Sequence, residues 1–222
     1  MQHEKFSPKA FLFDLNGTMI NDMDYHNHAW HDILTNTLGA DISFAEVKKE
    51  MYGKNQELLD RVFGKNHFSN AHAEEISMQK ELSYQQAYGP HLSLISGLDK
   101  FLAKASSHQI KMAIGSAAIP FNIDFVLDGL QIRNYFEAIV SAADVIISKP
   151  DPETFLKGAE ILGIEPKDCL VFEDAPKGVE AALNAGMKCV VLTTMHTADE
   201  FNYPNIIAFI SDYNDDSLKQ LF

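Results

Sequence analysis

Six short runs of apolar residues, spread along the chain, constrain the fold more than any other feature. They are rich in Ile, Val and Phe and do not alternate with polar residues. They comprise Ala10–Phe13, Met112–Ile114, Ala138–Val140, Leu170–Phe172, Cys189–Leu192 and Ile206–Ile210. Such runs are typical of strands buried on both faces of a parallel sheet. With 222 residues, 46% of them hydrophobic, the chain can bury such a sheet and still carry an insert.

Helical patterns separate several of these runs. Residues 98–105 place Leu, Phe, Leu and Ala at the i, i+3, i+4, i+7 spacing that gathers apolar side chains on one helix face. Parts of the same pattern recur at 155–162 and at 179–183. Strands that alternate with helices predict an α/β fold, with a doubly wound and mostly parallel sheet.

The segment from about Asn21 to Tyr88 breaks this alternation, because it contains no convincing strand. Four helix-like stretches fill it, and each runs up to a glycine, a common helix stop. They are YHNHAWHDILTNTLG, SFAEVKKEMYG, NQELLDRVFG and SNAHAEEISMQKELSYQQAYG. We expect residues 1–20 and 89–222 to form an α/β core, and residues 21–88 to form an inserted helical domain.

Charge and cysteine content narrow the classes of partner and compartment. The formal net charge of −13 argues against nucleic acid or an anionic membrane surface as a partner. Cys169 and Cys189 each open an apolar run, which favours buried free thiols in a reducing compartment over a disulfide or a metal pair. The N-terminal MQHEKFSPKA has no apolar signal core, and no run reaches the roughly 18 apolar residues of a membrane span. We expect a cytoplasmic protein, monomeric or weakly oligomeric, with a small-molecule partner.

Polar side chains follow the predicted strands at their carboxyl ends, where ligands bind in open α/β sheets. Asp14 ends the first run, and Ser116 ends MAIGS. Glu173 and Asp174 end LVFED, and Lys149 of ISKPDPETF follows another run. We therefore expect one hydroxyl, one ammonium and three carboxylates, distant in sequence, to converge.

These residue types suit phosphoryl transfer. Neighbouring carboxylates repel each other, and such a cluster persists when a cation lies among them or when one of them is protonated. Mg²⁺ prefers oxygen ligands and often acts beside phosphate. Asp14 would then attack phosphorus, Ser116 and Lys149 would hold the charged oxygens, and Gly17 would let the backbone approach closely. Each residue alone also fits a turn or a helix cap, so the prediction depends on their order along the chain.

The chain resembles the haloacid dehalogenase superfamily of phosphotransferases, in its β-phosphoglucomutase-like branch. The four motifs that carry the resemblance are DLNGT, AIGS, SKPDPETF and VFEDAPKGVEAALNAGM. The helical insert lies where that branch carries its α-helical cap, so the resemblance covers nearly the whole chain. It implies a Mg²⁺-dependent enzyme with a Rossmann-like core and with Asp14 as nucleophile and metal ligand. Asp174, Glu173 and the backbone carbonyl of Asn16 would complete the metal site.

The resemblance also implies which residues hold the phosphorylated substrate. In the core and the cap these are Gly17, Thr18, Ser116, Ala117, His26, Gly53, Lys54, Asn55, Gln56 and Lys80. Trp30 matches a recurrent aromatic of the cap or only packs in its core, whereas we assign His28 and His31 to an ordinary helix face. Sugar-phosphate mutases carry an arginine in the cap loop where this chain has Gln56, which would hold a second phosphate less well.

Asn16 departs from the family pattern, which has a second aspartate there as general acid and base. An amide cannot transfer a proton. General acid–base catalysis contributes typically about 10²–10⁴-fold, which is small beside the acceleration of up to about 10²¹-fold known for phosphate monoester hydrolysis. We therefore expect slow hydrolysis, best with good leaving groups such as acyl phosphates. Deamidation of Asn16, which precedes Gly17, is a second hypothesis for how an acid could arise here.

Three functions remain open on the sequence. The first is a Mg²⁺-dependent phosphatase of a small metabolite, such as a sugar phosphate or an acyl phosphate. The second is a sugar-phosphate mutase of the β-phosphoglucomutase kind, against which Asn16 and Gln56 count. The third is a catalytically impaired protein that binds a phosphorylated metabolite without turnover. Haloacid dehalogenation is not expected, because that branch lacks the metal-binding carboxylates that this chain retains.

Overall fold

The computed structural model describes residues 6–222, and the five preceding residues, where the sequence predicts no apolar signal core, lie outside it. The chain divides into two compact units. The α/β unit comprises the N-terminal segment up to Asn21 together with Ser93–Phe222, and the helical unit comprises Asp22–Leu92. No helix among the described residues is long and apolar enough to cross a membrane.

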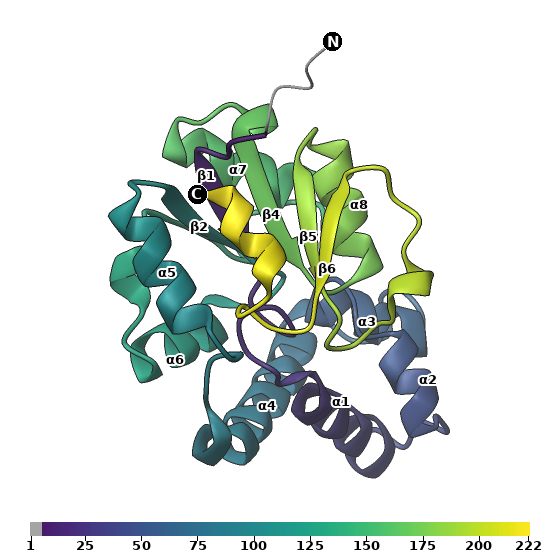
Figure 1. Cartoon of the computed structure of the whole chain (residues 1–222). Coiled ribbons are helices and arrows are strands. Elements are labelled where there is room, and N and C mark those ends of the chain that lie inside the picture. The colour runs from purple at the N-terminus through teal and green to yellow at the C-terminus, as the bar shows by residue number, and fades with distance from the viewer. Residues whose placement is uncertain (1–5) are drawn as a thin grey trace. The chain divides into compact units, whose positions relative to one another are not determined.

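A six-stranded sheet forms the centre of the α/β unit (Figure 1). Its strands are β1 (Ala10–Phe13), β2 (Lys111–Gly115), β3 (Ala138–Val140), β4 (Cys169–Glu173), β5 (Lys188–Leu192) and β6 (Ile206–Ile210). Their order is β3-β2-β1-β4-β5-β6, and every neighbouring pair is parallel. Each predicted run falls on a strand, so the prediction of a parallel α/β sheet is confirmed. Because β1 lies between β2 and β4, the strand order reverses beside it, and open α/β sheets bind ligands at the carboxyl ends of the strands beside such a reversal.

Helices complete the α/β unit. They are α5 (Leu98–Ser107), α6 (Pro120–Gly129), α7 (Glu153–Leu162) and α8 (Pro176–Asn184). Four short 3₁₀ helices, which the sequence did not predict, are Arg133–Tyr135, Pro166–Asp168, Ala198–Glu200 and Asp216–Leu221.

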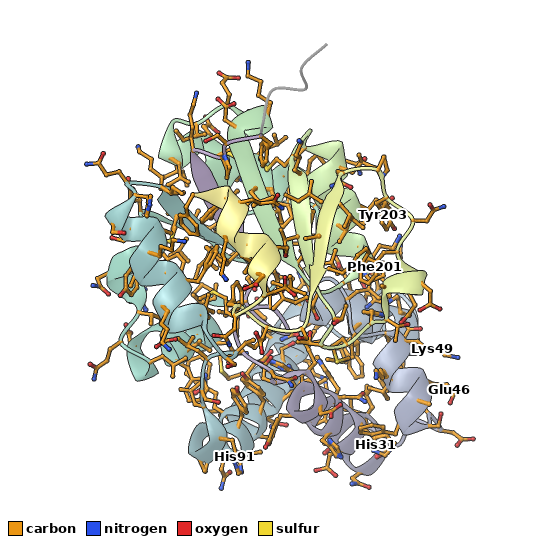
Figure 2. All side chains as sticks on the ribbon, in the orientation of Figure 1. His31, Glu46, Lys49, His91, Phe201 and Tyr203 are labelled. Atoms are coloured by element: carbon orange, nitrogen blue, oxygen red, sulfur yellow. The ribbon has the colours of Figure 1, made fainter. Side chains whose placement is uncertain are left out.

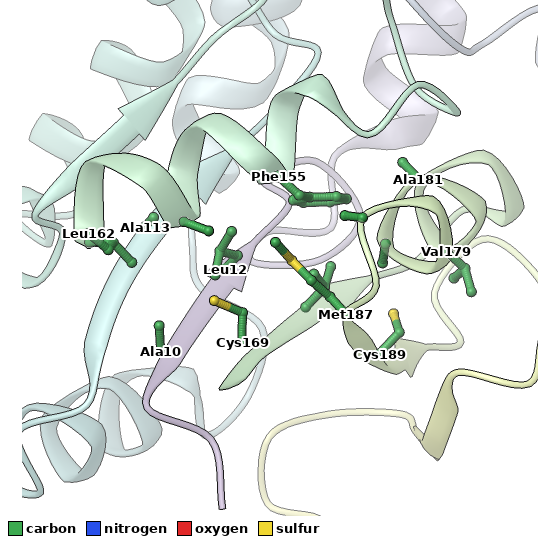
Figure 3. Close-up of a cluster of buried hydrophobic side chains, with 14 of the residues drawn as sticks. Ala10, Leu12, Ala113, Phe155, Leu162, Cys169, Val179, Ala181, Met187 and Cys189 are labelled. Atoms are coloured by element: carbon green, nitrogen blue, oxygen red, sulfur yellow. The ribbon is translucent and has the colours of Figure 1, made fainter. Parts of the chain in front are cut away.

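The two faces of the sheet bury different side chains, because successive strand residues point to opposite sides. On one face, Leu12 lies in a buried cluster with Phe155 of α7 and with residues of α8 (Figure 3). Both cysteines lie in that cluster as buried free thiols, as predicted. The other face buries Phe11, whose ring stacks on Phe101 of α5 with 5.3 Å between the centroids and meets Phe222 edge-on. Figure 1 shows the C-terminal turn in yellow over this face of β1 and β4.

The helical unit contains α1 (Met23–Asp32), α2 (Phe44–Lys49), α3 (Asn55–Phe63) and α4 (Asn70–Tyr88). A π-helical stretch, Ile33–Thr37, extends α1, and a 3₁₀ turn, Gly89–His91, follows α4. Gly64 follows α3 with a φ of +96°, as expected of a helix stop, whereas Gly89 keeps a helical φ of −47° and begins the 3₁₀ turn.

Trp30 lies in the hydrophobic core of the helical unit, together with Leu34 and Ile76. His28 and His31 both pack against Phe44, with centroid distances of 4.6 Å and 5.6 Å, which is consistent with an ordinary helix face. Figure 2 labels His31 on α1.

Candidate active site

β1 leads into the loop Asp14–Ile20, which folds back on itself. The N–H of Gly17 donates to the carbonyl of Ile20 at 2.8 Å. Gly17 has a φ of +75°, a left-handed conformation that glycine adopts without steric cost. A Cβ at Gly17 would lie 2.0 Å from Oδ2 of Asp174, so the loop needs a glycine here for a second reason. The backbone of the loop at Gly17 therefore lies very close to the carboxylate of Asp174, which belongs to the fourth motif.

Asp14, Glu173 and Asp174 form a carboxylate cluster at the carboxyl ends of β1 and β4. One oxygen from each lies within 4.8 Å of the others, and this is the one cluster with metal-binding geometry among residues 6–222. The three residues are only 8%, 2% and 4% exposed. Buried anions at this spacing require compensating positive charge.

Lys149 supplies part of that charge. Its ammonium donates to Oδ1 of Asp14 and to Oε1 of Glu173, both at 2.7 Å. Burial alone would lower the pKa of Lys149, but the carboxylates of Asp14 and Glu173 outweigh it and raise that pKa above its usual value. Lys149 is therefore protonated at neutral pH and holds the two carboxylates together.

Glu173 has protein partners on both of its carboxylate oxygens. Oε2 accepts hydrogen bonds from the N–H groups of Asp174 at 2.9 Å and Ala175 at 2.8 Å, while Oε1 accepts from Lys149. A Cβ at Gly178, in the first turn of α8, would lie 1.7 Å from Oε1. Glu173 thus links the ammonium of Lys149 to the start of α8.

The cluster fits a divalent cation. Three carboxylates and one ammonium leave an excess of negative charge, and the donors are the hard oxygens that Mg²⁺ prefers. The hydroxyl of Thr18 donates to Oδ1 of Asp174 at 3.3 Å and orients that carboxylate.

Ser116 lies at the carboxyl end of β2, the strand beside β1, as predicted. It is buried, and its hydroxyl accepts a hydrogen bond from the N–H of Ala118 at 3.1 Å. Ala117, between them, is half-buried. A serine that accepts from a following backbone N–H is also common in ordinary turns, so this contact by itself does not assign a role to Ser116.

In the helical unit, two of the predicted substrate residues meet. Nζ of Lys80 lies 2.6 Å from Nδ1 of His26, and the two residues are 2% and 6% exposed. Lys80 also donates to Glu81 at 3.0 Å, and Glu81 accepts from the side-chain amide of Asn55 at 2.7 Å. Burial lowers the pKa of Lys80, and the charges of Glu81 and Asp22 oppose that effect. Glu81 therefore ties Asn55, at the start of α3, to Lys80 of α4.

Tyr84 and Asp22 complete this buried polar group, and the sequence did not single out either of them or Glu81. The ring of Tyr84 stacks on His26 with 3.7 Å between centroids, and its hydroxyl donates to Oδ2 of Asp22 at 2.6 Å. Asp22 also lies 3.3 Å from Nε2 of His26. A signal was present, because Asp22 precedes His26 by four residues and Tyr84 follows Lys80 by four, a spacing that puts side chains on one helix face.

The other predicted cap residues lie at the start of α3. Gly53 has a left-handed φ of +74°, and Lys54 is the residue that precedes the helix. The amide of Gln56 donates to Oδ1 of Asp60, one turn further along α3, at 3.0 Å.

Comparison with known proteins identifies the family of the chain. The model of the haloacid dehalogenase-like hydrolase family matches residues 11–192. A β-phosphoglucomutase from Bacillus subtilis is 32% identical over 190 residues, which cover 82% of each chain. A fructose-1-phosphate phosphatase from Escherichia coli is 27% identical over 182 residues, which cover 82% of this chain and 94% of the relative. The crystal structure of a β-phosphoglucomutase from Clostridium difficile is 27% identical and has a TM-score of 0.80, with 96% of both chains covered.

The named relatives are a mutase and a phosphatase of small phosphorylated molecules. Phosphatases of this family generally use Mg²⁺, and the acidic cluster that such an ion needs is present. The family match spans most of the chain, and the fold, the four ordered motifs and the carboxylate cluster agree with it. The chain therefore belongs to the haloacid dehalogenase-like hydrolase family of enzymes, in its β-phosphoglucomutase-like branch.

Proposed function

We propose that the protein is a Mg²⁺-dependent phosphohydrolase, which acts on a small phosphorylated metabolite through an aspartyl-phosphate on Asp14. One observation carries this proposal. The ammonium of Lys149 holds Asp14 and Glu173 at 2.7 Å each, within a buried cluster that also contains Asp174. This arrangement supplies a fixed nucleophile, a positive charge beside it and oxygen ligands for a cation.

In the first step, a carboxylate oxygen of Asp14 attacks phosphorus, and the bond from phosphorus to the leaving-group oxygen breaks. The leaving group keeps that electron pair. Lys149 and Ser116 stabilise the charge on the transferring group and orient it for in-line attack. Asp14, Asp174 and the carbonyl of Asn16 would hold Mg²⁺, which would supply further positive charge at the phosphoryl oxygens.

In the second step, water attacks the aspartyl-phosphate, and the bond from phosphorus to Asp14 breaks. Free phosphate leaves with the oxygen of that water, the protons of the water end on phosphate or in the solvent, and the carboxylate of Asp14 is restored. Asn16 can neither protonate the leaving group in the first step nor take the proton of water in the second. Slow turnover follows, with a preference for acyl phosphates and other substrates whose leaving groups depart without a proton.

Contacts inside the helical unit support a hydrolase over a mutase, the second candidate. A mutase must hold a second phosphate group, which calls for unmatched positive charge or a bidentate arginine. The amide of Gln56 is bound to Asp60, and the charge of Lys80 is matched by Glu81 at 3.0 Å. The mutase is kept as a candidate because a named β-phosphoglucomutase is 32% identical to this chain.

We also propose where the enzyme acts, which partners it lacks and its oligomeric state. Two buried free thiols support the reducing cytoplasm as its compartment, and the net charge of −13 argues against nucleic acid and anionic membranes as partners. A monomeric or weakly oligomeric state is part of the same proposal.

Phosphate release from a panel of sugar phosphates, acyl phosphates and pyrophosphate, with Mg²⁺ present and Asp14→Asn as the blank, tests the proposal. We expect release by the wild type that is lost in the blank. Isomerisation of a sugar phosphate without release would instead establish the mutase. Mg²⁺-dependent binding of a substrate without any turnover would establish the impaired binding protein.

A further inference from the structure

Two side-chain hydroxyls from distant parts of the α/β unit hold consecutive carbonyl groups of the loop Asp14–Ile20. Oγ1 of Thr194, two residues after β5, donates to the carbonyl of Gly17 at 2.6 Å. The phenol of Tyr213, three residues after β6, donates to the carbonyl of Thr18 at 3.1 Å. The loop is thus fixed to the ends of two strands that supply none of the predicted catalytic residues.

A third contact continues the series. The backbone N–H of Ile95 donates to the carbonyl of Met19 at 2.9 Å. Three consecutive carbonyls of the loop, at positions 17 to 19, therefore each accept a hydrogen bond from a different segment. Only the two side-chain contacts can be removed by substitution without disturbing the backbone.

The loop has little freedom to move against the carboxylate cluster. A Cβ at Gly17 would lie only 2.0 Å from Oδ2 of Asp174, and the hydroxyl of Thr18 reaches Oδ1 of the same residue at 3.3 Å. Gly17 and Thr18 are the residues whose carbonyls Thr194 and Tyr213 hold. A shift of this loop would therefore change the distance between Asp174 and the backbone of Asn16, the neighbouring residue.

Tyr213 is itself firmly placed. Its ring is buried and lies 5.7 Å from the ring of Phe172 and 5.4 Å from that of Phe101. Burial raises the pKa of Tyr213 well above its usual value, and the charges of Asp14 and Asp174 raise it further. At neutral pH the phenol is protonated and can donate this hydrogen bond.

We propose that Thr194 and Tyr213 are positioning residues for the metal site. Their hydroxyls hold the loop so that the carbonyl of Asn16 and the carboxylates of Asp14 and Asp174 can bind one divalent cation together. In this role, neither residue contacts the substrate. The proposal shares the metal ligands of the proposed function, but it makes a claim about Mg²⁺ affinity that does not depend on turnover.

The chain offers matched substitutions. Thr194→Val and Tyr213→Phe each remove one hydroxyl and keep the shape of the side chain, and Thr194→Ser keeps the hydroxyl. Thr193→Val is the control for the threonine, because the hydroxyl of Thr193 donates to the carbonyl of Ile210 instead, at 3.2 Å. Tyr203→Phe is the control for the phenol, because Tyr203 packs against the core cluster on the segment that precedes β6 (Figure 2).

The test is the Mg²⁺ dissociation constant of the full chain, measured by titration calorimetry, with the melting temperature of each metal-free variant beside it. A neutral hydrogen bond contributes enough to change affinity between about twofold and tenfold. We expect Thr194→Val and Tyr213→Phe to weaken Mg²⁺ binding by such factors, and Thr194→Ser to restore it. We also expect faster amide hydrogen exchange in the peptide that contains residues 14–20 of both weakened variants, without metal.

The proposal is overturned if both variants bind Mg²⁺ as the wild type does, or if the two control variants weaken binding equally. It is also overturned if the wild type binds no Mg²⁺. Wild-type protein that binds Mg²⁺ but releases no phosphate from any substrate would refute the proposed hydrolysis alone, because the affinities would still decide the role of the two hydroxyls.

Discussion

The carboxylate of Glu173 occupies the space in which a side chain at Gly178 would begin. A Cβ at Gly178 would lie 1.7 Å from Oε1 of Glu173, and that same oxygen accepts from Lys149 at 2.7 Å. Lys149 in turn holds Asp14 at 2.7 Å. The space left by Gly178 on α8 is therefore filled by Glu173, which is linked through the two ion pairs of Lys149 to the predicted nucleophile, Asp14.

Gly178→Ala is expected to disturb the candidate site. The methyl group must displace Glu173, which breaks its contact with Lys149 and leaves buried charge poorly paired. We expect phosphate release to fall by about tenfold or more, and the melting temperature to fall as well. Replacing glycine by alanine within a helix ordinarily stabilises it by about 0.5–1 kcal/mol, so a loss of stability would be diagnostic. Lys177→Ala, at an exposed neighbour, is the control, and a Gly178→Ala protein as stable and active as this control would contradict the account.

Asn16→Asp is expected to restore the missing proton carrier. The gain should depend on the leaving group, because only a poor leaving group needs protonation. We expect formation of the aspartyl-phosphate from sugar phosphates to become faster by about 10²–10⁴-fold, and its formation from acyl phosphates to become faster by much less, whereas its hydrolysis should become faster after either substrate. Single-turnover rates of aspartyl-phosphate formation on both substrate classes measure the difference. Equal rates in the variant and the wild type, on both classes, would show that Asn16 does not limit turnover.

Asn16 is expected to remain an amide in the folded protein. Deamidation requires the backbone nitrogen of Gly17 to attack the side chain of Asn16, but the N–H of Gly17 is hydrogen-bonded to the carbonyl of Ile20 at 2.8 Å. Peptide mass mapping of active protein should therefore find asparagine at position 16, whereas protein held unfolded should convert faster. An active fraction that carries aspartate there would support the deamidation hypothesis instead.

Lys80 and Glu81 are expected to be coupled in the stability of the helical unit. Removing one partner of a buried ion pair leaves the other charge buried without its partner, which lowers the free energy of unfolding by about 3–5 kcal/mol. Lys80→Met and Glu81→Gln should each lower the free energy of unfolding, and the double variant should lose less than the sum by about 1 kcal/mol or more. Trp30, the only tryptophan of the chain, lies in the core of this unit, so its fluorescence reports the unfolding of the unit. Strictly additive losses would mean that the pair is not energetically coupled.

The strands and the carboxylate cluster could be predicted because their signals are local. Each apolar run identifies its own strand, and a parallel sheet necessarily gathers the carboxyl ends, which brings Asp14 close to Glu173. Lys149 joins them from the loop between β3 and α7. The contacts of Tyr213 and Thr194 with the loop could not be predicted in this way. Their partners lie 195 and 177 residues away and are backbone carbonyls, which leave no pattern of side chains in the sequence.

The buried polar group of the helical unit is an intermediate case. His26 and Lys80 were singled out through the family resemblance, and the structure places them 2.6 Å apart. Glu81, which pairs with Lys80, was not singled out, because a glutamate on a helix is usually exposed. Its burial follows only from the packing of α3 and α4, where it also accepts from Asn55.

The most direct test of the account is to look for the phosphoryl group on Asp14. Protein mixed with Mg²⁺ and an acyl phosphate is quenched in acid during turnover, and its peptides are analysed by mass spectrometry. Because Asn16 cannot activate water, hydrolysis of the intermediate should be slow, and we predict that the peptide containing Asp14 gains one phosphoryl group that is absent from Asp14→Asn. Phosphate release at the wild-type rate by Asp14→Asn, or turnover with no phosphorylated Asp14 at any time of quenching, would contradict the account.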